Sequence, residues 1–318
     1  MKAKQTANPI RPPRLTFLMG KGGVGRSTVA AAMGLALSRR GLRTLVVETS
    51  ARQAVPAMFE RRAAGYDPVE CAPGLHCLRV TWEDALREYG VMKLRFRALY
   101  RLVFENPFVR RLLPAVPGVP EILVIGKIAY CATDGVPGIG TPDAVVVDAP
   151  ATGHGLSLVT APAVVADTVP AGPLAEDARR LRAVLLDSAF TRFHIVTTPE
   201  EMPVSEGIDL HGELSLRHGL PFGPVIVNAF QDLALPGQER EMARLAAASS
   251  SAPRGVLAAV QAALFMDARH RAQTAHLDRL KTVVPLPVVR LPEVPGAAGG
   301  RVKGLADHID AVLWREAR

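Results

Sequence analysis

Cysteine is scarce in this chain, which has only three in 318 residues: Cys71, Cys77 and Cys131. Their number and irregular spacing exclude a disulfide framework, and the sequence holds no C-x-x-C pair of the kind that binds zinc. No run reaches the roughly 18 apolar residues of a membrane span, and no N-terminal stretch has the three regions of a secretory signal. We therefore expect a cytoplasmic protein in a reducing compartment.

Aromatic residues are also few, at 5% of the chain, although the formal net charge is +8. Because no dedicated nucleic-acid-binding module is recognisable, nucleic acid is not an expected partner. The remaining composition, 48% hydrophobic and 21% charged, is that of a chain able to bury a large core. We expect a flexible basic tail over residues 1–13, which holds three prolines, and a single domain over residues 14–318.

A glycine-rich segment lies near the N-terminus, where residues 20–28 read Gly-Lys-Gly-Gly-Val-Gly-Arg-Ser-Thr. The pattern G-x-x-x-x-G-K-[ST] wraps backbone N–H groups around a polyphosphate, directs its lysine at the β and γ phosphates and holds Mg²⁺ with its hydroxyl. Arg26 stands in the place of that lysine, and a second basic residue, Lys21, follows the first glycine. The flanking residues predict a strand over 14–19 and a helix over 27–40, so phosphate would lie at a helix N-terminus.

A second interpretation fits the same segment, because Gly20, Gly22 and Gly25 also satisfy the dinucleotide fingerprint G-x-G-x-x-G. Glu48 ends the next apolar strand, where an acid that binds ribose would lie. A nucleoside triphosphate is favoured because Ser27 and Thr28 offer hydroxyls that a dinucleotide does not need. A second acid, Asp148, also ends the buried strand 144–148, as a carboxylate that organises magnesium would.

The expected ligand is therefore ATP or ADP with Mg²⁺. The predicted binding residues are those of the phosphate loop, namely Gly20, Lys21, Gly22, Gly23, Val24, Gly25, Arg26, Ser27 and Thr28. The predicted metal ligands are Ser27, Glu48 and Asp148, and the predicted catalytic residues are Lys21, Arg26 and Asp148.

The rest of the chain alternates apolar strands with helical stretches. We predict strands at 193–198, 224–228 and 282–286, a helix at 204–217, and two packed helices within 238–275 that are joined by a linker at 249–253. This alternation is typical of an α/β fold with a doubly wound, mostly parallel sheet. Ligands of such sheets bind beyond the carboxyl ends of the strands, where Gly20, Glu48, Asp148, Thr198 and Asn228 all lie.

Two motifs together, Lys21-Gly-Gly-Val-Gly-Arg-Ser-Thr28 and Asp148-Ala-Pro-Ala-Thr-Gly-His154, resemble the deviant-Walker ATPases of arsenite pumps and tail-anchored-protein targeting factors. The similarity extends to residues 106–127, 198–204 and 225–228. It implies a phosphate-loop NTPase with a helical insertion, about residues 82–132, between the two nucleotide-sensing segments called switch I and switch II. It also implies ATP hydrolysis and a dimer, either a homodimer or a heterodimer with a paralogous ATPase.

The resemblance also implies roles for single residues. Lys21 would reach across the dimer to the nucleotide of the partner, and Asp148 would belong to switch II. Asn228 would touch the adenine, and a segment that includes Pro292 and Glu293 would lie over the base.

This chain departs from the family pattern in two places that matter for hydrolysis. Arg26 presents a planar fork in place of a compact ammonium. The stretch after Glu48 has no acid before Glu60, so no carboxylate is evident there to orient the attacking water. The arsenite-binding cysteines and the zinc-binding C-x-x-C of relatives are missing too. We predict slow hydrolysis; the alternatives left open are a non-hydrolysing regulatory subunit and, less favoured, a dinucleotide-dependent oxidoreductase.

Positive charge is concentrated in residues 87–111, which hold seven Arg or Lys and two acids. Apolar residues recur there at helical spacing, with Lys93, Arg97 and Arg101 as a basic stripe. Such a stripe is either a solvated helix face over an ordinary core or a surface for a protein client or a membrane-associated partner.

Overall fold

The computed structural model describes residues 12–50, 53–63, 65–94, 116, 118–248 and 253–314, with only the backbone described for residues 91–94. The basic stripe and most of the predicted tail lie outside the described residues. Of the predicted helical insertion, about residues 82–132, the structure describes residues 82–94, 116 and 118–132.

Eight strands of the described part form one sheet in the order β3-β4-β2-β5-β1-β6-β7-β8. Their bounds are β1 (Leu15–Met19), β2 (Thr44–Glu48), β3 (Val69–Ala72), β4 (Leu75–Arg79), β5 (Ala144–Asp148), β6 (Thr191–Thr197), β7 (Val225–Phe230) and β8 (Val288–Pro292). All neighbouring pairs are parallel except β3, an antiparallel edge strand. The predicted fold class, a doubly wound and mostly parallel α/β sheet, is confirmed.

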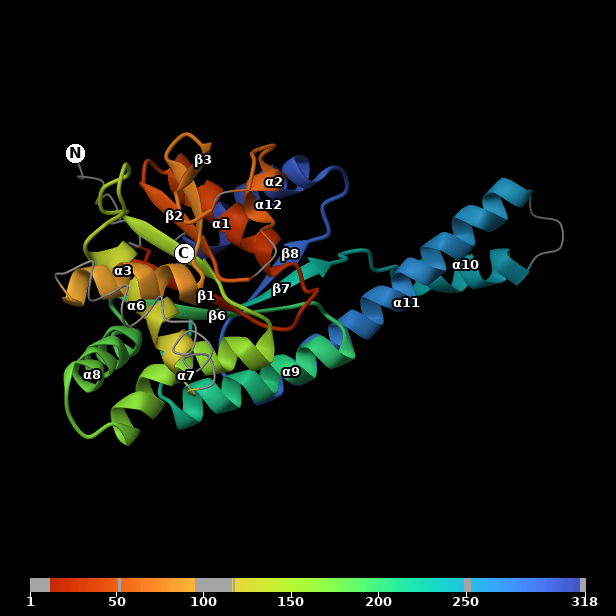
Figure 1. Ribbon diagram of the computed structural model, residues 1–318. Helices are drawn as coiled ribbons and strands as arrows, with labels where there is room; N and C mark the ends of the chain where they lie inside the picture. The colour runs from red at the N-terminus through yellow and green to blue at the C-terminus, as the bar shows by residue number, and fades with distance from the viewer. Residues whose placement is uncertain are drawn as a thin grey trace, which may run out of the picture.

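Helices cover both faces of this sheet (Figure 1). They are α1 (Arg26–Arg39), α2 (Val55–Met58), α3 (Trp82–Leu94), α6 (Val119–Thr133), α7 (Thr152–Thr168), α8 (Pro173–Leu186), α9 (Glu201–His211) with a π-helical continuation η2 (Gly212–Arg217), α10 (Gly237–Ala248), α11 (Arg254–Val283) and α12 (Ala298–Leu313).

Two hydrophobic cores result because successive strand residues point to opposite faces. On β1, Leu15, Phe17 and Met19 pack into the core that includes α6, α7 and α8. Leu18 faces the other core, with the buried residues of α1 and α12. Central strands buried on both sides read as continuous apolar runs, which is why β5 has the sequence Ala-Val-Val-Val-Asp.

One predicted strand is wrong. Residues 282–286 were expected to form it, but α11 continues to Val283 and the strand is β8 at Val288–Pro292. Leu277, Leu280 and Val284 are buried at helical spacing, which carries the helix past the expected boundary. The prolines at positions 285 and 287 then delay the strand until the chain can join the sheet.

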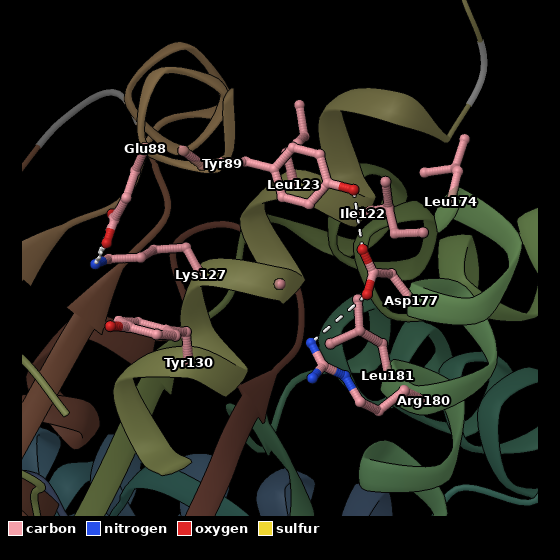
Figure 2. Close-up of a pocket in the computed structure, with 12 residues that line it drawn as sticks. Glu88, Tyr89, Ile122, Leu123, Lys127, Tyr130, Leu174, Asp177, Arg180 and Leu181 are labelled. Carbon is pink, nitrogen blue, oxygen red and sulfur yellow. Dashed lines mark hydrogen bonds and ion pairs between the residues drawn. The ribbon is translucent and has the colours of Figure 1, made fainter. Parts of the chain in front are cut away.

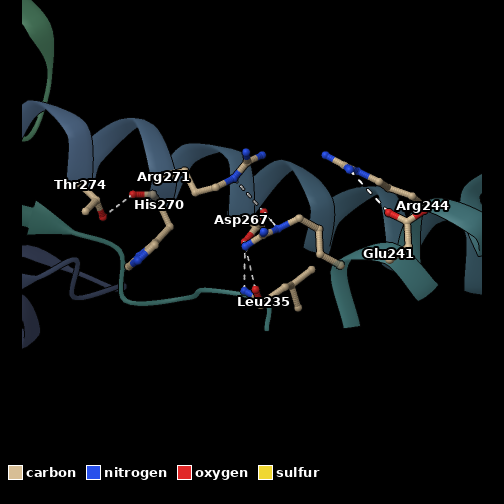
Figure 3. A network of polar contacts seen from close by, with 8 residues as sticks. Leu235, Glu241, Arg244, Asp267, His270, Arg271 and Thr274 are labelled. Carbon is tan, nitrogen blue, oxygen red and sulfur yellow. Dashed lines mark hydrogen bonds and ion pairs between the residues drawn. The ribbon is translucent and has the colours of Figure 1, made fainter. Parts of the chain in front are cut away.

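The predicted helices of residues 238–275 are present as α10 and α11, but α10 contributes no buried residue. The two helices form a hairpin that extends away from the sheet (Figure 1). Its base is held by the buried carboxylate of Asp267, which accepts hydrogen bonds from the backbone N–H of Leu235 and from the guanidinium groups of Arg240 and Arg271 (Figure 3). The buried residues of α11 are Asp267, Gln273, Leu277 and Leu280, all in its C-terminal half.

Candidate nucleotide-binding site

The glycine-rich loop joins the end of β1 to the start of α1, as predicted. A Cβ at Gly20 would lie 2.1 Å from the carbonyl oxygen of Val196 on β6, so only glycine fits beside that strand. Gly25 has φ +84°, and a Cβ there would lie 2.3 Å from Nδ2 of Asn228. Among the described residues no side chain caps the first turn of α1, so its N–H groups are left for an anion at the loop.

Ser27 and Asp148 meet at this loop, although 121 positions separate them. The Ser27 hydroxyl donates to Oδ2 of Asp148 at 2.5 Å. The parallel pairing of β1 with β5 brings them together, since it aligns Leu18 with Asp148. Asp148 is 2% exposed, and burial raises its pKa while the contacts with Ser27 and Arg26 oppose that shift.

This pair fits a magnesium ion. Oδ1 of Asp148 is buried and accepts no hydrogen bond from the described residues; its ion-pair partner is Nε of Arg26, at 3.5 Å, so a hard oxygen lies beside the Ser27 hydroxyl. Mg²⁺ usually binds to one or two protein oxygens, with water and phosphate oxygens as its other ligands. Consistent with that, the described residues include no cluster of three His, Cys, Asp or Glu side chains placed to hold a metal.

Arg26 lies across the loop. Its Nη1 donates to the carbonyl oxygen of Gly20, and its Nε is 3.5 Å from Oδ1 of Asp148. The side chain is 11% exposed, and burial lowers the pKa of its guanidinium. Arg26 thus ties the end of β1 to the end of β5, and phosphate must compete with Asp148 for it.

Glu48 lies on β2 beside Asp148 on β5, but its carboxylate is already engaged. Oε1 accepts hydrogen bonds from the backbone N–H groups of Ala54 and Val55 at the start of α2, and Oε2 contacts the thiol of Cys77. Burial raises the pKa of Glu48, which is fully buried. The metal role of Glu48 stays a prediction: a metal, or the ribose of a dinucleotide, would have to compete with these contacts at the start of α2.

Lys21 has a partner within its own subunit, which the sequence did not predict. Its Nζ donates to Oε1 of Glu206 on α9, and the hydroxyl of Thr152, the first residue of α7, is 3.3 Å from Oε2 of the same carboxylate. The two charged side chains are 29% and 35% exposed. Glu206 therefore joins the phosphate loop to the segment that follows Asp148.

The residues expected near the base lie at the same edge of the sheet. Nδ2 of Asn228 donates to the carbonyl oxygen of Val24 at 2.9 Å and so braces the loop from β7. Pro292 ends β8, and the carboxylate of Glu293 accepts a hydrogen bond from Gln231 at 3.1 Å. The contacts of Asn228, Pro292 and Glu293 with a nucleotide remain predictions.

Two clefts lie on the β4 side of the loop. One of about 770 Å³ is lined by the segments after β2, β4 and β5, including Thr49, Thr81 and His154. The other lies between α3, α6 and α8, where apolar side chains such as Ile122 and Leu181 are flanked by a Lys127–Glu88 ion pair and a Tyr89–Asp177 hydrogen bond (Figure 2). In the described part of the chain, no helix is long and apolar enough to cross a membrane.

Comparison with known proteins also indicates a nucleotide-binding ATPase. Residues 13–171 match the family model of the anion-transporting ATPases. ATPase BagA of Mycobacterium tuberculosis is 32% identical over 224 residues, which are 68% of this chain and 64% of the relative. A putative ATPase of Mycobacterium bovis matches to the same extent. The arsenical pump-driving ATPase of Acidiphilium multivorum is 27% identical over 254 residues, covering 74% of this chain and 42% of the relative. The chain thus spans less than two thirds of the length of these relatives.

Proposed function

Because this chain belongs to the anion-transporting ATPase family, we propose that it binds ATP or ADP with Mg²⁺ at residues 20–28 and uses the nucleotide as a switch. The observation that carries the proposal is the pair formed by the Ser27 hydroxyl and the buried carboxylate of Asp148 at the N-terminus of α1. A dinucleotide would need no such pair, and Glu48, the ribose acceptor on which that alternative relied, already accepts two hydrogen bonds at the start of α2.

In this proposal the metal is held by Ser27 and, directly or through water, by Asp148. When bound, Mg²⁺ neutralises charge on the β and γ phosphates. The backbone N–H groups of the loop and of the first turn of α1 orient the phosphate chain, and Arg26 supplies a buried positive charge beside it. Asn228, Pro292 and Glu293 border the position of the base.

A further part of the proposal is that two subunits, identical or paralogous, meet face to face across the nucleotides. Each chain has one glycine-rich phosphate loop, and Arg26 already supplies a cation within it, so Lys21 can face the phosphates of the partner once it leaves Glu206. Once Lys21 has left Glu206, the Lys21 side chains of two apposed loops repel each other, and triphosphate removes that repulsion. A protein client or a membrane-associated partner would bind the basic stretch 87–111.

We propose slow hydrolysis, or none, in the isolated protein. Arg26 is held by Asp148 and by the carbonyl oxygen of Gly20, and it lacks the point-charge geometry of lysine. No acid lies between Glu48 and Glu60 to orient water. The Arg26–Asp148 pair also favours a second candidate, a non-hydrolysing regulatory subunit that assembles with an active homologue. Arsenite transport is not proposed, since the chain lacks the cysteines that relatives use for it.

The subunit arrangement is tested by mass photometry of wild type and Lys21→Ala, each with and without Mg-ATP. We expect Mg-ATP to shift wild type from monomer to dimer, the shift to weaken in high salt, and Lys21→Ala to remain monomeric. An identical mass distribution under all four conditions would contradict the nucleotide-dependent dimer.

A further inference from the structure

Residues 148–152 are held at both ends by the phosphate loop. At one end, Asp148 contacts Ser27 and Arg26. At the other end, the hydroxyl of Thr152 shares the carboxylate of Glu206 with Lys21. Arg26 thus contacts Asp148 at the start of this five-residue turn, and Lys21 contacts Glu206, which binds Thr152 at its end.

The loop and the turn are also close in space. A Cβ at Gly22 would lie in ordinary contact with Cβ of Ala151, at 3.8 Å. Behind the turn, a Cβ at Gly155 would lie 2.7 Å from the carbonyl oxygen of Pro150 and 3.3 Å from the terminal methyl of Met19. The turn is thus confined between the loop and β1, and its ends can move only if the contacts of Asp148 and Thr152 change.

Nucleotide competes for both cations: phosphate at the loop competes for Arg26, and in the proposed dimer phosphate of the partner competes for Lys21. The carboxylates of Glu206 and Asp148 carry one charge each, whereas a triphosphate carries several and is bound by the same loop. The Lys21–Glu206 pair is about one third exposed and therefore weak, so it breaks more readily than the buried Arg26–Asp148 pair. Once Lys21 turns away, Glu206 loses the charge that orients its carboxylate, and its contact with Thr152 loosens.

We propose that Glu206 is a positioning residue that couples the phosphate loop to the turn at residues 148–152: it holds Lys21 and Thr152 together until nucleotide withdraws Lys21. The inference rests on the proposed nucleotide site, and it assigns the signal from that site to one carboxylate on α9. Glu206 has no contact with substrate in this proposal, and it acts only through the two side chains that it bridges.

The test is hydrogen exchange, followed by mass spectrometry, of the peptide that covers residues 149–158. Wild type is compared with Glu206→Gln, and each protein is measured without nucleotide and with saturating Mg-ATP. Without nucleotide we expect Glu206→Gln to speed exchange of this peptide up to about fivefold, the range set by a partly exposed ion pair. With Mg-ATP we expect the two proteins to exchange alike, because nucleotide has already broken the bridge in wild type.

Three further variants separate coupling from ordinary support of the helix. Thr152→Val should reproduce the effect and Thr152→Ser should not, because serine keeps the hydroxyl. In the Lys21→Ala background, Glu206→Gln should add little, since the two changes remove the same bridge. Glu239→Gln removes one negative charge from the remote hairpin helix α10 and should leave the peptide unchanged.

Equal exchange of wild type and Glu206→Gln without nucleotide would overturn the bridge. A difference that persists unchanged with Mg-ATP would overturn the coupling and leave Glu206 as a structural residue of α9. Calorimetry on the same samples distinguishes these results from failure of the proposed function. If wild type binds no Mg-ATP the nucleotide site itself is wrong, whereas binding with a persistent difference refutes only the coupling.

Discussion

Replacement of Arg26 by lysine tests whether the substitution in the phosphate loop limits catalysis. The guanidinium spans from the carbonyl oxygen of Gly20 to Oδ1 of Asp148 and is 11% exposed. A lysine ammonium is a single point of charge and cannot make both contacts at once. It can, however, reach the phosphate position that the loop pattern reserves for lysine.

Two opposite effects are expected. Loss of the charged hydrogen bond to Gly20 removes about 1.5–3 kcal/mol of stabilising free energy. The ammonium recovers part of this from Asp148, so the free energy of unfolding should fall by about 1–2 kcal/mol. Hydrolysis should rise. A well-placed donor is worth about 10²–10³ in rate, but the water-orienting acid is still missing, so we expect an increase of about tenfold, or about 1.4 kcal/mol of barrier.

The assays are urea unfolding and single-turnover release of phosphate from Mg-ATP. Arg39→Lys is the matched control, since Arg39 lies on the same helix and forms an exposed ion pair with Asp307. It should change stability by less than about 0.5 kcal/mol and leave hydrolysis unchanged. A hydrolysis rate of Arg26→Lys that equals or falls below that of wild type, with Mg-ATP still bound, would refute the reasoning about the loop.

Two other predictions follow from the geometry. Gly25→Ala should weaken Mg-ATP binding in calorimetry by about tenfold or more, because φ +84° costs alanine about 1–2 kcal/mol and its Cβ would meet Asn228. Gly212→Ala, whose Cβ would meet no atom within 4 Å, should bind normally, and equal affinities of the two variants would contradict the account. The hairpin base should be labile to acid. Hydrogen bonds to Asp267, chiefly from Arg240, lower the pKa of its carboxyl to about 2. The stability that Asp267 adds is therefore present above the unfolded pKa of about 3.9 and is lost as pH falls through about 2. Hydrogen exchange of α10 between pH 5 and pH 2 checks this, and Asp267→Asn should remove the pH dependence.

Local pattern was sufficient to predict the loop and the buried strands around it. Short motifs, whose backbone geometry is set by neighbouring residues, include the glycines of the loop, Ser27 and the strand that ends at Asp148. The parallel topology then follows from the alternation of strands and helices, and it brings Ser27 and Asp148 together across 121 positions. For this part of the site, sequence and structure agree.

The missed features depend on contacts that no spacing encodes. The bridge from Lys21 to Glu206 joins residues 185 positions apart, and an acid on the exposed side of a helix gives no signal of its partner. Glu48 was assigned by its place at a strand end alone. The signal for its engagement was α2, which begins at Val55, seven residues later, with Pro56 in its first turn, and whose first N–H groups need an acceptor. Residues 282–286 were ambiguous because a short apolar run suits a strand or the end of a buried helix.

The pairing of Ser27 with Asp148 as a magnesium-nucleotide site is tested most directly by calorimetry of Mg-ATP binding to wild type and Ser27→Ala, with NAD as the competing ligand class. Ser38→Ala is the control, because Ser38 lies on the same helix and its hydroxyl only donates to the carbonyl oxygen of Leu35. We predict that wild type and Ser38→Ala bind Mg-ATP alike and better than NAD, and that Ser27→Ala weakens Mg-ATP binding by about tenfold, or about 1.4 kcal/mol. Mg-ATP affinity that is unchanged in Ser27→Ala, or NAD binding that is tighter than Mg-ATP binding, would contradict the assignment.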